Sequence, residues 1–183
     1  MSGRLVVLAM VVTALFGLVA CTNTTPGAAV TPPVETTTSA NTPSSTTSGS
    51  GLAAVQPCEL LSSAEVSQNG LTSTGPTAGS GARSCGWDNN AYDNGLGYTI
   101  GADIHDNQGI KDINTGGYSV SDDPIGHHQA KELRTTNGDL CSVVLGVTDT
   151  SRVDVSANTG TADINQACVL ANQYAKLIEP KLP

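Results

Sequence analysis

Four cysteines between residues 52 and 183 constrain the fold of this chain more than any other feature. They divide into two equal spacings, because 85 − 58 and 168 − 141 are both 27. An even number of cysteines is typical of a disulfide framework in an exported protein. Three pairings are possible, and we favour the sequential one, Cys58 with Cys85 and Cys141 with Cys168.

Two other uses of these cysteines fit the sequence less well. A four-cysteine zinc site is usually built from C-x-x-C pairs, and the chain has none. A redox-active pair is also expected to have its cysteines two or three residues apart. We therefore expect the cysteines to be structural, with no metal site and no cofactor.

The first twenty residues have the pattern of a secretory signal peptide. A basic start ending at Arg4 precedes sixteen uncharged, mostly apolar residues, Leu5 to Ala20, which is short of the roughly 20 residues of a permanent membrane helix. The run ends in LVAC at Cys21, which resembles the bacterial lipobox. That resemblance implies cleavage before Cys21 and lipidation of its thiol. We expect a protein held by lipid on the extracytoplasmic face of the cell membrane.

The composition changes sharply at residue 51. Residues 22–51 are rich in Thr, Ser, Pro and Gly with Glu35 as the one charge, so they cannot bury enough apolar surface to offset their own ordering. We expect residues 21–51 to be a disordered tether, with or without O-linked sugars, and residues 52–183 to be one domain. The net charge of −8 excludes a general nucleic-acid binder and favours a partner with a cationic face.

Alternating apolar and polar residues predict several strands. One covers Tyr98 to His105, a second covers Arg152 to Asn158, and a third places Cys141 and Val143 on one face. Cys85 and Trp87 share a strand face, which we interpret as a disulfide packed beneath an indole in the core.

Helical patterns stand at both ends of the domain. Apolar residues at helical spacing over Thr161–Ile178 predict a C-terminal helix that Pro180 ends. A short first helix is expected within Pro57–Val66, with Ser62 or Ser63 as the cap and Gly70 after its end. The predicted fold class is α+β: a single antiparallel β-sheet packed with an N-terminal short helix and a C-terminal helix, carrying two disulfides.

The turn before Cys141 admits two registers. A two-residue loop at Asn137-Gly138 would place Cys141 on the same face as Glu132 and Arg134, whereas a three-residue loop would place it beside Leu133. We favour the three-residue loop, because it keeps the two charged residues out of the core.

No constellation in the chain points to catalysis. His127 and His128 follow Asp122-Asp123-Pro124, which we interpret as a polar loop, with a weak metal site as the alternative. Asp103, Asp106 and Asp112 lack the spacing of a calcium loop, so we interpret them as solvated turns. A nucleophile needs a base held by a third group, and no such arrangement can be identified. We expect no catalytic residues.

The landmarks taken in order resemble a family. They are the lipobox cysteine and Thr/Ser/Pro tether, followed by Pro57-Cys58-Glu59-Leu60-Leu61, Cys85-Gly86-Trp87, Cys141-Ser142-Val143 and Ala167-Cys168 before a Leu-Pro end. This set resembles the uncharacterised actinobacterial lipoproteins that include mycobacterial proteins of the Lpr type. The resemblance covers residues 52–183 and implies a cell-surface domain without an assigned activity.

The sequence therefore favours a binding or interaction module over an enzyme. We expect attachment to the membrane through Cys21 and a partner in the cell envelope, either a protein or a small apolar ligand. A cell-envelope hydrolase and a small-lipid carrier are the alternatives. The first lacks an evident acid–base or nucleophile set, and the second would need apolar residues beyond those of the core.

Overall fold

The computed structural model describes residues 51–79, 81–90, 96–136 and 138–183, and the structural statements below concern these residues alone. The predicted signal peptide, Cys21 and the tether up to residue 50 lie outside them. The elements in chain order are η1 Leu52–Ala54, η2 Pro57–Glu59, α1 Ser63–Gln68, β1 Thr72–Gly79, β2 Ala82–Asn89, β3 Tyr98–His105, η4 Ile110–Asp112, β4 Tyr118–Asp122, β5 Gln129–Thr135, β6 Leu140–Thr148, β7 Ser151–Thr159, α2 Ile164–Ile178 and η5 Glu179–Lys181.

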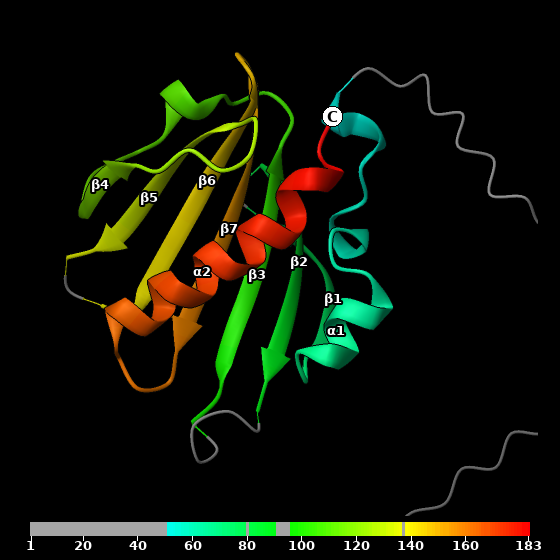
Figure 1. Cartoon of the computed structure of the whole chain (residues 1–183). Coiled ribbons are helices and arrows are strands. Elements are labelled where there is room, and N and C mark those ends of the chain that lie inside the picture. Colours follow the sequence, from blue (N-terminus) through cyan, green and yellow to red (C-terminus); the bar gives the residue numbers. More distant parts are fainter. Residues whose placement is uncertain (1–50, 80, 91–95, 137) are drawn as a thin grey trace, which may run out of the picture. The chain divides into compact units, whose positions relative to one another are not determined.

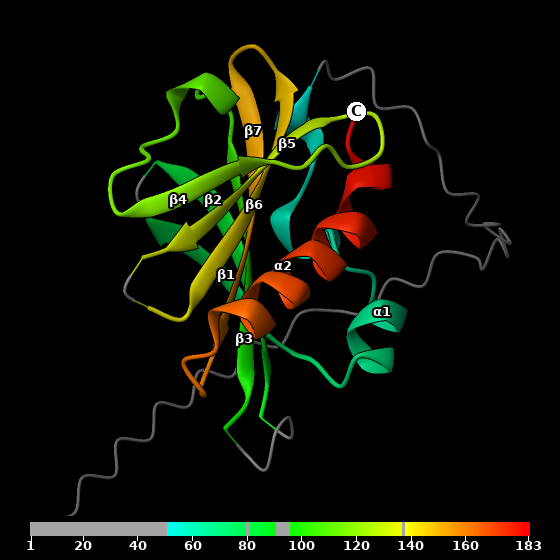
Figure 2. The same ribbon diagram turned by 60° about the vertical axis from the view of Figure 1, so that its left-hand side comes forward.

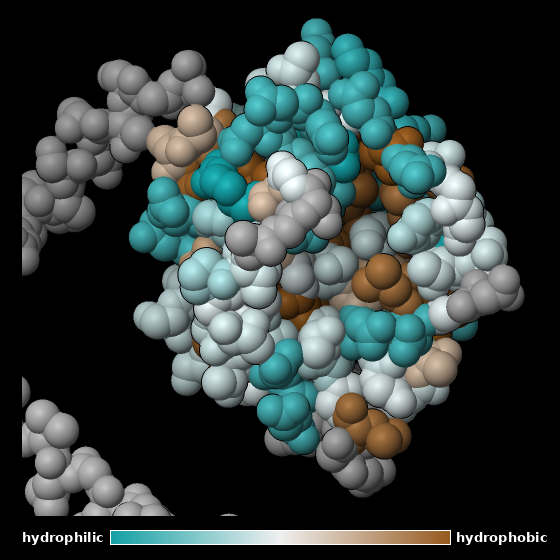
Figure 3. Space-filling view, turned by 180° about the vertical axis from the view of Figure 1, so that it is seen from behind, coloured by the Kyte–Doolittle hydropathy of each residue, from teal (hydrophilic) through white to brown (hydrophobic). Residues whose placement is uncertain are grey.

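The seven strands form one antiparallel sheet in the order β1-β2-β3-β7-β6-β5-β4. Helix α2 runs diagonally across one face of this sheet, and α1 lies at its β1 side (Figures 1 and 2). The predicted α+β fold class is confirmed. The opposite face, seen in Figure 3, is mostly hydrophilic or weakly polar and is interrupted by small hydrophobic patches.

The core lies between the sheet and α2. Alternate residues of β3 and β7 are buried, including Ile100, Ala102 and Val155, as expected for strands with one face covered. The helix contributes a buried stripe that ends at Tyr174 and Ile178. The hydroxyl groups of Tyr98 and Tyr174 lie 2.9 Å apart, so the polar ends of both rings are hydrogen-bonded inside this core.

Both disulfides have the predicted sequential pairing. Cys58 of η2 is bonded to Cys85 of β2, and Cys141 of β6 is bonded to Cys168 of α2. Each therefore joins a terminal segment to the sheet. Cys85 and Trp87 are each 1% exposed, which confirms the interpretation of this strand face as core.

The helix boundaries follow the capping residues more closely than the apolar spacing. Helix α2 begins at Ile164, three residues later than predicted, because the Asp163 carboxylate accepts hydrogen bonds from the backbone N–H groups of Asn165 and Gln166. The predicted first helix is divided into η2 and α1. Ser62 is the cap of α1, and Gly70, with φ of 63°, follows its end.

The favoured hairpin register was wrong. Arg134 pairs with Cys141 and Leu133 pairs with Ser142, so Glu132 and Arg134 face α2. Their charges are accommodated because each lies within reach of the other and of polar side chains on the helix. Leu133 instead pairs with Val120 of β4 on the far face of the sheet. The rule that charged side chains avoid the covered face fails here because this border of the core is itself polar.

Candidate functional site: a groove between α2 and β5

A surface groove of about 340 Å³ follows the border between α2 and β5. Its walls come from two elements that are far apart in the sequence. They are Glu132 and Arg134 on β5, and Asn165, Cys168, Val169, Asn172, Gln173 and Lys176 on one side of α2. The observed pairing of Arg134 with Cys141 turns Glu132 and Arg134 of β5 toward the helix, where they form one wall of the groove.

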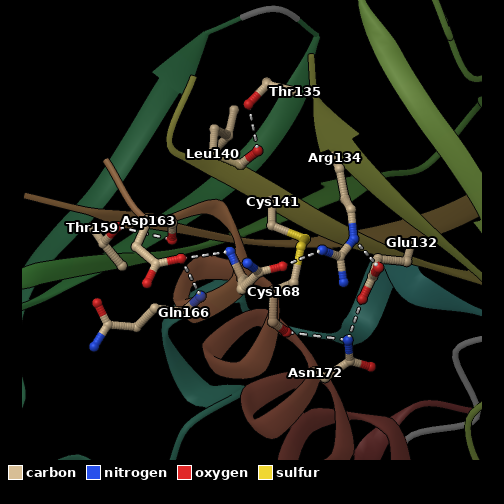
Figure 4. The surroundings of a disulfide bond; sticks show 11 residues. Glu132, Arg134, Thr135, Leu140, Cys141, Thr159, Asp163, Gln166, Cys168 and Asn172 are labelled. Carbon is tan, nitrogen blue, oxygen red and sulfur yellow. Dashed lines mark hydrogen bonds and ion pairs between the residues drawn. A yellow bond between two sulfur atoms is a disulfide. The ribbon is translucent and has the colours of Figure 1, made fainter. Parts of the chain in front are cut away.

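Glu132 holds the two walls together. Its carboxylate accepts hydrogen bonds from Arg134 Nε at 2.7 Å and from Asn172 Nδ2 at 2.7 Å, one at each oxygen (Figure 4). The Glu132 side chain is only 10% exposed. A buried carboxylate is costly unless it is paired and hydrogen-bonded, and both of its oxygens are satisfied here.

Arg134 forms a second link across the groove. Its Nη1 group donates to the Asn165 side-chain oxygen at 3.0 Å, near the start of α2. The Arg134 side chain remains 38% exposed. Its Nη2 group has no partner among the described residues, so it is available to an acceptor from outside the chain.

The Cys141–Cys168 disulfide lies beside these polar contacts (Figure 4). Cys141 is fully buried and Cys168 is 2% exposed. The bond ties the first half of α2 to β6, and therefore fixes the distance between the helix and the neighbouring strand β5. We therefore expect the position of the groove walls to depend on this bond more than on the Cys58–Cys85 bond, which lies at η2 and β2.

Glu132, Cys141 and Cys168 bring three metal-ligating atoms within 4.8 Å of one another. The two sulfur atoms are bonded to each other, so neither can act as a thiolate ligand. In the oxidised protein this cluster is therefore a disulfide with an adjacent ion pair.

The open side of the groove combines an exposed apolar residue with an exposed cation. Val169 is 67% exposed, the highest value among the exposed large hydrophobic residues of the described chain. Lys176 lies two helical turns further on and is also exposed. Asn172 Oδ1, which is buried beside them, has no hydrogen-bond partner within the described residues. Val169 and Lys176 can receive an apolar group and an anionic group together, whereas the Asn172 oxygen can only accept a hydrogen bond.

The histidines lie elsewhere and are separately engaged. His128 Nδ1 is 2.9 Å from the buried Glu179 carboxylate, and the His127 backbone N–H donates to the same carboxylate at 2.8 Å. These hydrogen bonds, the one from His128 foremost, hold the pKa of Glu179 below its ordinary range. His105 lies 3.3 Å from Asp154 on the face of the sheet opposite α2.

The predicted loop carboxylates also have structural partners. Asp122 is 2.6 Å from Lys131, and His128 is bonded to Glu179. Among the described residues, the one group of three potential metal ligands, at Glu132, Cys141 and Cys168, includes neither of them. Asp106 forms an ion pair with Arg83, whose hydrogen bonds lower the pKa of the Asp106 carboxyl. The Arg83 side chain also donates to two carbonyl oxygens of the N-terminal segment. Asp106 thus serves the fold and is not a freely solvated turn residue.

Comparison with known proteins gives one match of consequence. Residues 16–181 match the model of a family described as "Protein of unknown function (DUF3558)", which is almost the whole chain. The chain belongs to the DUF3558 family. No curated protein and no solved structure matches it.

Membership in DUF3558 agrees with the uncharacterised domain family expected from the sequence, and brings no assigned activity. The groove of this DUF3558 domain was missed because the wrong hairpin register was favoured. A usable signal was present: in the two-residue-loop register, Glu132, Arg134 and Cys141 fall on one face. Because Cys141 is bonded to Cys168, that register also places the C-terminal helix next to Glu132 and Arg134.

Proposed function

We propose that this DUF3558 protein is a lipid-anchored lipoprotein of the extracytoplasmic membrane face, whose domain binds a protein partner through the groove between α2 and β5. Two disulfides support the location, because such bonds persist in oxidising compartments outside the cytoplasm. The apolar run ending at Cys21 supports the lipid anchor. None of the helices formed by the described residues has the length and hydrophobicity of a membrane span.

The observation that carries the binding proposal is the exposed set of side chains around Val169. A large aliphatic side chain at 67% exposure gains from contact with a partner, at roughly 25 cal/mol for each Å² removed from water. Amide and charged side chains surround it, as in the polar rim of a protein interface. Such a surface fits a recognition role.

A protein partner is favoured over a small apolar ligand. The apolar side of α2 is buried against the sheet, with Ala167, Ala171 and Ala175 allowing close approach. The groove beside it is lined mainly by charged and amide side chains, which would be costly to bury against an acyl chain. A polypeptide offers hydrogen-bond partners to such a surface.

Site-specific photocrosslinking in intact cells tests this function. A photoreactive amino acid is placed at Val169 of the full chain, and at Leu96 as a control of similar exposure, 59%, at the β2–β3 end of the sheet. We expect a discrete crosslinked protein from position 169 that is absent from position 96. Equal adducts from both positions, or none from position 169, would refute a groove-based binding role.

A further inference from the structure

Ion pairing leaves two cations of the domain without an acidic partner. The described chain holds seven Lys and Arg side chains, and five of them form ion pairs with Asp or Glu: Arg83, Lys131, Arg134, Arg152 and Lys181. Lys111 and Lys176 form no ion pair or side-chain hydrogen bond with another described residue. Lys176 belongs to the groove, whereas Lys111 lies on η4.

The accessible charge of the groove is therefore positive. Glu132 and Arg134 neutralise each other, and the Glu132 carboxylate has both oxygens occupied. Asp163, at the start of α2, is outside the groove lining and accepts backbone N–H groups. Lys176 and the free Nη2 group of Arg134 remain as charged donors toward solvent. Both favour an anionic acceptor.

We propose that the groove binds an extended acidic segment of a partner polypeptide. A carboxylate of that segment pairs with Lys176, an aliphatic side chain covers Val169, and a further oxygen accepts from Arg134. This inference rests on the proposed binding function and specifies the chemistry of the partner.

The spacing of the groove residues suits an extended chain. Val169 and Lys176 are seven residues apart on one helix, which corresponds to roughly 10 Å along its axis. An extended peptide advances about 3.3 Å per residue, so an acidic residue two to four positions from the aliphatic one comes within reach of the long Lys176 side chain. The amide nitrogen of Asn165 and the amide oxygen of Gln173 have no hydrogen-bond partner among the described residues. They can bond the unpaired main-chain groups of such a segment, which a helix would not present.

The acidic character of the chain sharpens this specificity. With a net charge of −8, most of the protein surface repels an acidic segment, and the groove is one of the few places that attract it. The net charge by itself led to the opposite expectation, a partner with a cationic face. The two expectations differ in the sign of the charge on the partner, and the peptide selection described next decides between them.

Selection from a random peptide library on the full chain, with both disulfides formed and in mild non-ionic detergent, tests the proposal. We expect enrichment of peptides with Asp or Glu two to four residues from an aliphatic residue. The Kd of a selected peptide is then compared between the unchanged protein and three variants, K176Q, V169S and K111Q.

The variants separate the groove from general charge effects. K176Q removes a charge-assisted hydrogen bond and is expected to weaken binding about tenfold. V169S removes one buried aliphatic contact and is expected to weaken it by roughly fivefold or more. K111Q makes the same change in net charge outside the groove and should leave the Kd unchanged. Replacing the peptide's acidic residue with its amide should reproduce the K176Q effect.

Each other outcome overturns the acidic-segment proposal. Selected peptides that are basic or neutral but sensitive to V169S would leave the binding function standing with a different partner. Equal losses in K176Q and K111Q would mean non-specific attraction. Displacement of the peptide by phosphatidylglycerol in mixed micelles with the same detergent, absent in K176Q, would assign Lys176 to a phosphate headgroup. Failure to select any groove-dependent peptide removes the proposal, and crosslinking at Val169 then decides separately whether the binding function survives.

Discussion

The two disulfides provide an internally controlled experiment on stability and binding. Both bonds close loops with a sequence separation of 27 residues. Their effect on the entropy of the unfolded chain is therefore the same, although they lie at different places in the fold. The experiment replaces one pair at a time with alanine, giving C58A/C85A and C141A/C168A in the full chain.

The loop length sets the expected loss of stability. The chain-entropy relation gives about 3.6 kcal/mol at 25 °C for a loop of this size. For a domain of roughly 130 residues this corresponds to a fall in Tm of about 13 °C. We expect both double variants to lose this much in urea-unfolding experiments, before any further loss from the missing sulfur contacts.

The effect on binding should differ between the two variants. Cys141–Cys168 ties α2 to β6 beside the groove, whereas Cys58–Cys85 ties η2 to β2. At a temperature where both variants are folded, C141A/C168A should lose the Val169-dependent crosslink and C58A/C85A should retain it. Circular dichroism at that temperature provides the check on folding.

Two results would refute this reasoning. If the two free energies of unfolding differ by more than about 2 kcal/mol, loop entropy is not the main contribution and native-state contacts decide the stability. If both variants retain the crosslink equally, the bond beside the groove does not position its walls.

Three further predictions concern the anchor, acid stability and the core. C21A should move the protein from the membrane fraction to the soluble fraction and remove the acyl mass seen by mass spectrometry; continued sedimentation with membranes would contradict the lipid anchor. Hydrogen bonds from Lys181 and Ser62 lower the pKa of Glu65 from 4.5 to about 2, so its stabilising contribution is present above pH 4.5 and is lost as the pH falls through 2. The denaturation midpoint of E65Q should consequently vary less over that interval than that of the unchanged protein, and parallel curves would refute the assignment. W87A should cost about 3–5 kcal/mol in urea unfolding, because this indole is 1% exposed, and a loss below about 1 kcal/mol would show that the site is not core.

Local patterns were sufficient for much of the fold. The strand containing Ile100 and the strand containing Val155 were predicted from alternation alone, because each has one face toward the core. The helix over Ala171 and the Ser62 cap follow from similarly local rules. Equal spacing of the cysteines favoured the pairing that the structure has, although two other pairings were open.

The candidate site depended on information that is not local. The partner of Cys141 is Arg134 if the loop has two residues and Leu133 if it has three. A shift of one residue exchanges the two faces of a strand. The rule that charged residues avoid a covered face favoured the wrong register. Glu132 can lie on that face because it has hydrogen-bond partners on its own strand and on α2.

The sequence by itself determined the class of the fold and the use of the four cysteines in two disulfides, since short periodic patterns and cysteine spacing carry that information. Only the tertiary structure decided which residues meet. It placed Glu132 beside Asn172, forty residues away, and left Lys176 without an acidic partner within the described chain. Such contacts depend on strand register and helix position together, and these are settled by the packing of the whole domain.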